Sequence, residues 1–294
     1  MDFNTLKSSQ SNFDAITKAL ETKLSPADQT NKNKYQDERI WKPELDKTGN
    51  GYAVIRFLPA SKDEEMPWVR VWSHAFQDKG GWYIENSLTT LNKKDPVSED
   101  NTRLWNTGVD SDKDIARKRK RKLSYYSNIY IVSDPKHPEN EGKVFLFKFG
   151  KKIFDKITEA MQPAFDDEKP INPFDFWKGA NFKLKIRKVD GYWNYDKSEF
   201  ESVSALAGND EEIKKTWSTQ HALKPFLAAD NFKTYEELKE KLHRVLSGAR
   251  KTETVAVADL PPQQNGAVKS STNSPVASDD DDTMSYFSKL AEDE

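Results

Sequence analysis

Short stretches of hydrophobic residues, broken by polar positions, run through the middle of the chain in the pattern of β-strands. The stretch 51–58 is almost continuously apolar and ends at Pro59, and the stretch 68–72 alternates between apolar and polar positions. Turn signals rich in Gly, Asp and Pro separate such stretches. The same signals predict four further strands, at 82–84, 124–132, 143–149 and 182–189.

Two stretches inside this region carry apolar residues at helical spacing, at 151–161 and 235–247. A third amphipathic stretch lies near the N-terminus, where Phe13, Ile16 and Leu20 recur every three or four residues. Short strands with a few inserted helices predict a mainly β fold with accessory helices, and an oligonucleotide-binding (OB) barrel suits this pattern. Periodicity alone does not distinguish such a barrel from a β-sandwich.

Composition divides the 294 residues into three parts. Residues 33–248 hold nearly all the tryptophans and the strand-like stretches, and we expect them to form the folded core. Residues 1–32 are expected to form an N-terminal arm, and 249–294 a flexible linker with an acidic tail. Because the chain has 0 cysteines and no apolar run of membrane-spanning length, we expect a cytoplasmic protein with no disulfide, no cofactor and no membrane contact.

The formal net charge of −2 hides a separation of charge along the chain. Residues 279–294 hold seven acidic side chains and one lysine, a net charge of −6, so residues 1–278 carry +4. A basic body with an acidic tail is typical of proteins that bind a polyanion. Apolar residues in the tail could form one helical face for a protein partner. The residues expected to bind partners are Asp279, Asp280, Asp281, Asp282, Tyr286, Phe287 and Leu290.

Six consecutive basic residues precede a tyrosine pair, Tyr125 and Tyr126, at the start of an expected strand. Clustered cations attract phosphates and aromatic rings stack on unpaired bases, so this arrangement favours single-stranded nucleic acid. A solvated basic loop or a localisation signal is the alternative for an isolated basic cluster. The basic side chains are Arg117, Lys118, Arg119, Lys120, Arg121 and Lys122.

Other aromatic residues lie in polar loops or turns beside cations. Trp105 is expected in a long polar loop, and a turn tip follows the basic strand 183–188. We interpret rings in such places as stacking sites. The turn tip contributes Tyr192, Trp193 and Tyr195, and the basic strand contributes Lys183, Lys185 and Arg187. Rings in strand-like or apolar contexts are assigned to the core instead, and these are Trp72, Phe76, Trp82, Phe145, Phe149 and Trp177.

Several motifs carry a resemblance to a known family, and they are the stretches 51–59, 82–85, 104–107, 120–126, 134–135, 138–145, 149–153 and 179–182. In sequence and order they resemble the single-stranded DNA-binding (helix-destabilising, gene 32) proteins of T-even-type bacteriophages. The resemblance covers roughly residues 41–200. It implies an OB core that coats single-stranded DNA in phage DNA replication, recombination and repair. It also implies self-association along DNA through the N-terminal arm, and an acidic tail that recruits a polymerase, a helicase loader, a primase and a recombinase mediator.

By position, the resemblance implies which side chains meet DNA. The implied cleft rings are Trp105, Tyr125, Tyr126, Phe147, Tyr192 and Tyr195, and the implied phosphate contacts are Lys120, Arg121 and Lys122. Phe147 enters from the resemblance alone, whereas Trp193 comes from the residue pattern alone.

Family members often hold a structural zinc ion on one histidine and three cysteines. This chain has His74 at the histidine position, but Ser87, Asp95 and Ser98 stand where the thiolates would be expected. Serine hydroxyls are poor zinc ligands at neutral pH. We therefore expect no metal, and a His74 side chain that is satisfied by hydrogen bonds.

No residue pattern indicates an enzyme, because the four histidines are scattered and no phosphate-binding glycine loop is present. The remaining alternative is an acidic-tailed RNA-binding protein or scaffold that docks through residues 117–122. Salt titrations with DNA and RNA homopolymers would distinguish these two functions.

Overall fold

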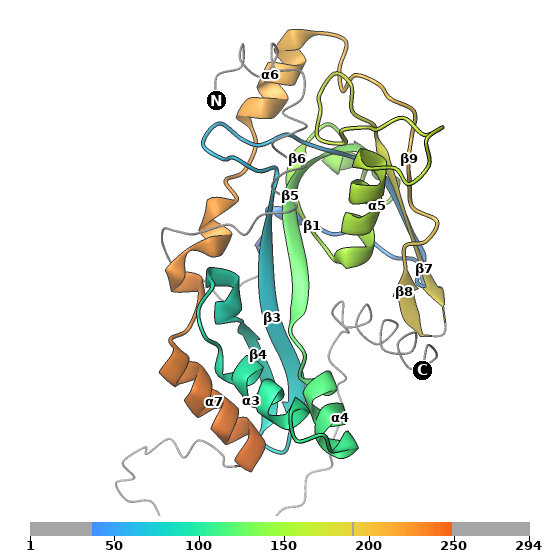
Figure 1. Cartoon of the computed structure of the whole chain (residues 1–294). Coiled ribbons are helices and arrows are strands. Elements are labelled where there is room, and N and C mark those ends of the chain that lie inside the picture. The colour runs from blue at the N-terminus through green and yellow to red at the C-terminus, as the bar shows by residue number, and fades with distance from the viewer. Residues whose placement is uncertain (1–36, 190, 249–294) are drawn as a thin grey trace, which may run out of the picture.

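The computed structural model describes residues 37–189 and 191–248 (Figure 1). The predicted arm, residue 190 and the acidic tail lie outside these residues. The described chain is mostly β-sheet with a few helices, so the predicted fold class is confirmed. No helix of the described residues is long and apolar enough to cross a membrane.

All the strands of the described residues belong to one nine-stranded network with the order β1-β6-β5-β2-β7-β8, in which β3 pairs with both β5 and β4, and β9 pairs with β7. The long strands β3 and β5 run from the upper to the lower half of the molecule and connect the two (Figure 1). The strands are β1 (Ile40–Trp41), β2 (Gly51–Phe57), β3 (Trp68–Asp78), β4 (Gly81–Asn86), β5 (Lys122–Ser133), β6 (Val144–Phe149), β7 (Phe182–Val189), β8 (Tyr192–Asn194) and β9 (Glu199–Phe200).

The helices include the two that the apolar spacing predicted, α5 and α7. Helix α7 begins with a capping box in which Thr234 and Glu237 bond reciprocally, and it ends at Gly248, whose φ of 73° suits a residue without a Cβ atom. The helices are α3 (Pro96–Trp105), α4 (Asp110–Lys118), α5 (Lys151–Met161), α6 (Asp210–Ser218) and α7 (Tyr235–Ser247), with the short 3-10 turns η1 (Leu88–Leu91), η2 (Pro138–Asn140), η3 (Lys224–Leu227) and η4 (Ala229–Asn231).

The expected long polar loop around Trp105 is instead a helix pair, α3 and α4. The Asp95 carboxylate accepts hydrogen bonds from the backbone N–H groups of Val97 and Ser98, and Pro96 occupies the first helical turn. These N-terminal signals start α3 although its apolar positions are few. Trp105 is therefore the last residue of a helix, which holds its ring on a defined element.

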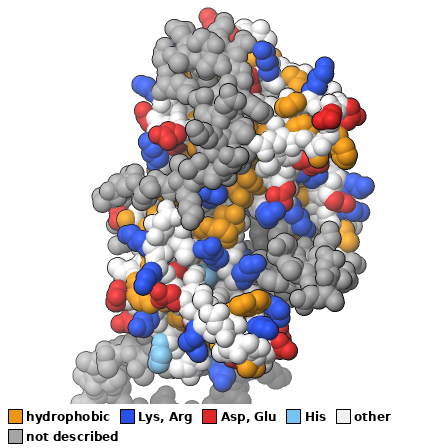
Figure 2. All heavy atoms as spheres, viewed as in Figure 1, with side chains coloured by type: hydrophobic (Ala, Val, Ile, Leu, Met, Phe, Trp, Pro, Cys, Tyr) orange, Lys and Arg blue, Asp and Glu red, His pale blue; other side chains and the backbone are white. Residues whose placement is uncertain are grey.

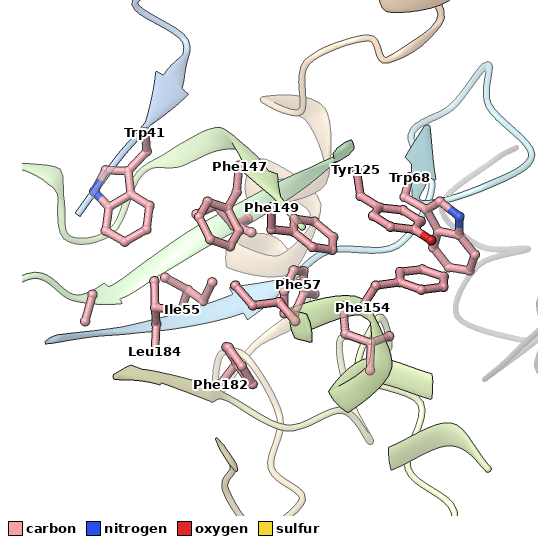
Figure 3. Close-up of a cluster of buried hydrophobic side chains, with 14 of the residues drawn as sticks. Trp41, Ile55, Phe57, Trp68, Tyr125, Phe147, Phe149, Phe154, Phe182 and Leu184 are labelled. Atoms are coloured by element: carbon pink, nitrogen blue, oxygen red, sulfur yellow. The ribbon is translucent and has the colours of Figure 1, made fainter. Parts of the chain in front are cut away.

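The largest core fills the upper half, where strands β1, β2, β5, β6 and β7 and helix α5 contribute side chains to one cluster (Figure 3). Phe57 lies near its centre and contacts the rings of Phe149, Phe174 and Phe182 at centroid distances of 5.6 to 5.8 Å. One such core inside several curled strands is consistent with the predicted OB barrel.

A second core lies in the lower half, where α7 and α3 cover one face of the β3–β4 hairpin. Phe76 and Tyr83 stack there at 5.0 Å. Because neighbouring strand residues point to opposite faces, Trp82 and Ile84 point away from this core and are 49% and 60% exposed. The assignment of Trp82 to the core is therefore wrong. Of the other predicted core rings, Phe76 and Phe149 are buried, whereas Trp72, Phe145 and Trp177 are half-buried.

Candidate nucleic-acid interface

The six basic residues run from the last turn of α4, through the short connection 119–121, to the first residue of β5. Positive side chains are favourable at a helix C-terminus, which suits Arg117 and Lys118 at the end of α4. Both are exposed. Arg117 also pairs with Asp114 at 2.7 Å, on the same helix.

Arg119 differs from its neighbours because its side chain is only 11% exposed. Its guanidinium pairs with Asp78 at 2.7 Å and with Asp100 at 3.3 Å, which connects the end of α4 to the β3–β4 hairpin and to α3. The positive charge of Arg119 is therefore paired with carboxylates of the same chain. The side chain therefore holds the helix pair against the hairpin, and the expected contact of Arg119 with phosphate stays a prediction.

Trp105 presents an exposed ring at the C-terminal end of α3, as the sequence predicted, with 49% of its surface accessible. The guanidinium carbon of Arg117 lies 5.4 Å from the centroid of this ring. A cation at this distance from an indole face is attracted to it. The two helices thus place one ring and one positive charge side by side on the surface.

A second such pair forms where β5 begins. The guanidinium carbon of Arg121 lies 4.2 Å from the ring centroid of Trp72, which is half-buried on β3. Trp72 is directly opposite Leu123 in the strand register, and Arg70 is opposite Tyr125, so these side chains share one face of the sheet. Neither Arg70 nor Trp72 was predicted as a site residue, because a single strand pattern does not show which face of β3 is left open.

Figure 2 shows Lys and Arg side chains around a hydrophobic patch between the upper and lower halves of the molecule. Lys120 and Lys122 flank Arg121 in the chain, the first exposed and the second half-buried. A surface of this kind provides charge for phosphates and flat apolar faces for bases.

Tyr125 and Phe147 do not offer free ring faces (Figure 3). Tyr125 is 5% exposed and stacks on Phe154 at 3.9 Å, and burial raises the pKa of its hydroxyl to about 12. Phe147 is 4% exposed and lies between Trp41 and Phe149. The expectation that these two rings line the cleft is wrong in this structure, because both complete the barrel core.

Tyr126 points to the opposite face of β5 from Tyr125 and stacks on Phe226 of η3 at 4.3 Å. Burial raises the pKa of its hydroxyl to about 12. One face of this ring is therefore already covered by the chain. The expectation that Tyr126 stacks on a base stays a prediction, and such stacking could involve only the face of the ring that Phe226 does not cover.

The basic strand β7 is largely neutralised by carboxylates that follow it in the chain. Ion pairs at the surface hold three of its four cations, with N–O distances of 3.0, 2.7 and 2.5 Å. The pair with Glu201 raises the pKa of Lys183, and its hydrogen bond lowers the pKa of Glu201. Exposed pairs contribute only ~0–1 kcal/mol, so phosphates could replace these carboxylates at little cost. The pairs are Lys183 with Glu201, Lys185 with Glu199, and Arg187 with Asp196.

The β7–β8 hairpin carries the three remaining predicted rings. Tyr192 is 36% exposed at the hairpin tip. Trp193 is half-buried, with the Lys188 ammonium 5.7 Å from its ring centroid, and Tyr195 is half-buried against the barrel core. Only Tyr192 is as open as the sequence predicted.

The four positions that correspond to a zinc site come together around the Asp95 carboxylate. Its oxygens accept hydrogen bonds from the Ser87 hydroxyl and the Ser98 N–H, each at 3.0 Å, and His74 Nε2 lies 3.3 Å away. The other ring nitrogen of His74 lies 2.9 Å from the Arg119 carbonyl oxygen. Burial opposes ionisation of Asp95, but these contacts outweigh it and hold its pKa at about 2. The donors present do not fit a thiolate zinc site, since the carboxylate is already used by its neighbours.

The residues expected to bind protein partners, Asp279 to Asp282, Tyr286, Phe287 and Leu290, lie outside the described residues. The N-terminal arm does so as well.

Comparison with known proteins gives a family and named relatives. The model of the family described as "gp32 DNA binding protein like" matches residues 49–246. The chain is 42% identical over 223 residues to the single-stranded DNA-binding protein of Enterobacteria phage T2, an alignment that covers 73% of this chain and 72% of the relative. The protein of the same name from Enterobacteria phage T4 matches with the same identity and coverage. A shorter match, 49% identical over 55 residues, covers 19% of this chain and 49% of the single-stranded DNA-binding protein of Escherichia phage SV14.

Proposed function

The chain belongs to the gp32 DNA binding protein like family, and on this premise we propose that it binds single-stranded DNA with little regard to sequence. The observation that carries the proposal is the pairing of two accessible rings with arginines, Trp72 with Arg121 and Trp105 with Arg117. Bases would stack on the rings while the arginines and nearby lysines meet phosphates. Every base has a π-face, so such binding tolerates any sequence.

The binding surface proposed here differs from the one expected from sequence. It keeps Trp105, Arg117 and Arg121 and adds Trp72 and Arg70. It omits Arg119, which is held in ion pairs, and the covered rings of Tyr125, Tyr126 and Phe147. The remaining cations of the proposed surface are Lys118, Lys120, Lys122, Lys183, Lys185 and Arg187, and its remaining rings are Tyr192, Trp193 and Tyr195.

The proposed role is to coat single strands during phage DNA replication, recombination and repair, in the cytoplasm of the host cell. Phage relatives with the name single-stranded DNA-binding protein support this role. Self-association along the strand through residues 1–32 is part of the proposal. The arm has one cation, Lys7, in the stretch 7–9, so it supplies little charge of its own.

The acidic tail is proposed to recruit replication and recombination proteins and to compete weakly with DNA for the basic surface. Its seven acidic residues mimic phosphates at a high effective concentration, because the tail is tethered to the core. Truncation after Ala277 tests both parts. It should raise the affinity for single strands at low salt and abolish partner binding, and the affinity difference should shrink at high salt.

Titration of the full chain with oligo-dT, oligo-U and duplex DNA at several salt concentrations tests the main proposal. Single strands should quench tryptophan fluorescence, and the affinity should fall steeply with salt. The doubly substituted variant Trp72→Ala/Trp105→Ala should lose most of the quenching and the affinity. Trp82→Ala is the matched control, because Trp82 is equally exposed but lies on the other face of the sheet.

Binding of neither nucleic acid, or equal loss of affinity in the control variant, would refute the proposed surface. Binding of oligo-U in strong preference to oligo-dT would favour an RNA-binding protein.

A further inference from the structure

An acidic turn with an exposed aromatic side chain follows α5 at the upper right of the molecule (Figure 1). Phe165 is 69% exposed, which is the largest exposed fraction of any large hydrophobic side chain in the described residues. The next three residues, Asp166, Asp167 and Glu168, are also exposed. A backbone hydrogen bond from Glu168 N to the Phe165 carbonyl closes the turn at 3.1 Å, so the ring projects from a defined structure.

An open pocket of about 760 Å³ lies in the lower half of the molecule, between η1, the start of α3 and the segment that leads into α7. Its apolar lining includes Leu88, Leu91 and Phe232. A hydrogen bond of 2.6 Å from the Tyr235 hydroxyl to Glu99 joins the two sides of the pocket. The volume is ample for an aromatic side chain.

Lysines surround the apolar lining of this pocket. Lys93, Lys94 and Lys233 all contribute to it and are exposed. Lys94 makes only a distant contact with Glu99, at 4.0 Å, whereas Lys233 pairs with Glu85. The rim therefore carries positive charge that the fold neutralises only in part.

The turn carries an exposed ring and acidic side chains, whereas the pocket has an apolar lining and lysines. The turn lies in the upper half of the molecule and the pocket in the lower half (Figure 1). A turn on one molecule cannot fill its own pocket, but it can fill that of a neighbour. We propose that Phe165 of one molecule inserts into the lysine-rimmed pocket of the next molecule on the same DNA strand, with Asp166 and Asp167 against Lys93 and Lys94. This inference rests on the proposed coating of single strands.

Such a contact is heterologous, because two different surfaces of identical molecules meet. Repetition of a heterologous contact that does not close into a ring generates an open filament. A filament of this kind fits a linear strand of any length. The contact adds a direct link between folded cores to the link that residues 1–32 are expected to provide.

Two variants break the contact from opposite sides, Phe165→Ala and Lys93→Glu/Lys94→Glu. Each should lower cooperativity on poly-dT by about tenfold, the effect expected when one buried aromatic anchor or its charged rim is lost. Neither should change the affinity for an oligonucleotide of about eight nucleotides, which holds a single molecule. Restored cooperativity is expected when Asp166→Lys/Asp167→Lys is combined with the lysine reversals in one chain, because the charges are then exchanged across the contact.

Lys136→Glu/Lys143→Glu provides the matched control, since both lysines are exposed near the far end of β5 from Lys122. This variant should keep wild-type cooperativity. Unchanged cooperativity in both contact-breaking variants, or no restoration by the charge exchange, would overturn the proposal. An effect of the pocket variant that disappears when the chain is truncated after Gly248 would also overturn it, since the tail would then be the occupant. If the wild-type chain fails to bind the short oligonucleotide, the proposed function itself fails instead.

Discussion

The guanidinium carbon of Arg121 lies 4.2 Å from the centroid of the Trp72 ring, across the junction between β3 and the start of β5. A cation held over an indole face is stabilised by the ring, and the ring in turn loses freedom. The pair therefore presents charge and an aromatic surface together. Bound DNA would use both at once, so their contributions to affinity should be coupled.

Replacement of Trp72 by Ala should weaken single-strand binding by ~1–3 kcal/mol if one base stacks on it. Arg121→Ala should weaken binding less at high salt than at low salt, and it should reduce the salt slope by about one phosphate contact. The double variant should lose less affinity than the sum of the two single changes, because each change already disturbs the pair. Fluorescence titration with oligo-dT measures all three. Strict additivity would show that the two side chains bind independently.

Arg119 should prove to be a stability residue although it lies inside the basic run. Arg119→Ala leaves Asp78 and Asp100 without their partner and should cost ~1–3 kcal/mol of the free energy of unfolding. Thermal melts measure this loss. Lys118→Ala is the matched control, because this lysine is exposed at the end of the same helix and should change the salt dependence of DNA binding but leave the melt unchanged. Equal melts for the two variants would contradict the assignment.

Local pattern was sufficient for most elements of the fold. The spacing of apolar residues located α5 and α7, and the strand-like stretches correspond to β2 to β7. Helices α3 and α4 were missed because their apolar residues are sparse and their start depends on the cap at Asp95. The motifs shared with phage proteins were sufficient to indicate the family, which the match of residues 49–246 to the family model confirms.

The candidate site could be predicted less completely, because its accessibility depends on residues distant in sequence. Arg119 is held by Asp78, 41 positions away, and Tyr126 is covered by Phe226. The residues 117–122 and their neighbours in sequence do not indicate either contact. The prediction for Trp72 erred in the opposite sense: a tryptophan on a strand is normally buried, yet this ring is only half-buried and lies beside Arg121.

Trp82 and Tyr83 should respond oppositely to truncation, although they are neighbours. Tyr83 is fully buried and stacks on Phe76, so Tyr83→Ala should cost ~3–5 kcal/mol of stability. Trp82→Ala removes an exposed ring and should cost less than about 1 kcal/mol. Chemical denaturation of both variants checks this order. A larger loss for Trp82→Ala would mean that the β4 register is shifted by one residue.

Asp95 should give the protein a pH-dependent share of its stability. Its pKa is about 2 in the folded state against an ordinary value of 3.8, so the ionised carboxylate stabilises the fold above pH 3.8, and this contribution disappears as the pH falls through 2. Asp95→Asn should therefore destabilise the protein by about 2 kcal/mol at pH 7, the free energy that corresponds to this lowering of the pKa. The difference between variant and wild type should shrink towards pH 2.

Chemical denaturation of the wild-type protein and of Asp95→Asn between pH 7 and pH 2 measures this difference in the free energy of unfolding. A constant difference would show that Asp95 acts through the shape of the α3 cap and not through its charge.

Because the donors around His74 do not fit a zinc site, we also expect a chelator to leave the wild-type melting temperature unchanged.

The carboxylates paired with the cations of β7 should compete with DNA phosphates and so lower the affinity for single strands. Glu199 accepts a hydrogen bond of 2.7 Å from the Lys185 ammonium, and this bond lowers the pKa of Glu199, so the carboxylate is charged at neutral pH. A phosphate that binds Lys185 must displace this carboxylate. Glu199→Gln removes the competing charge and should raise single-strand affinity at low salt, with a salt slope that is steeper by about one phosphate contact. Glu211→Gln, an exposed substitution on α6, is the control and should change neither quantity. If Glu199→Gln leaves the slope unaltered, or if Lys185→Ala does not lower affinity, DNA does not reach β7, and the binding surface is confined to the side formed by β3, α3 and the start of β5.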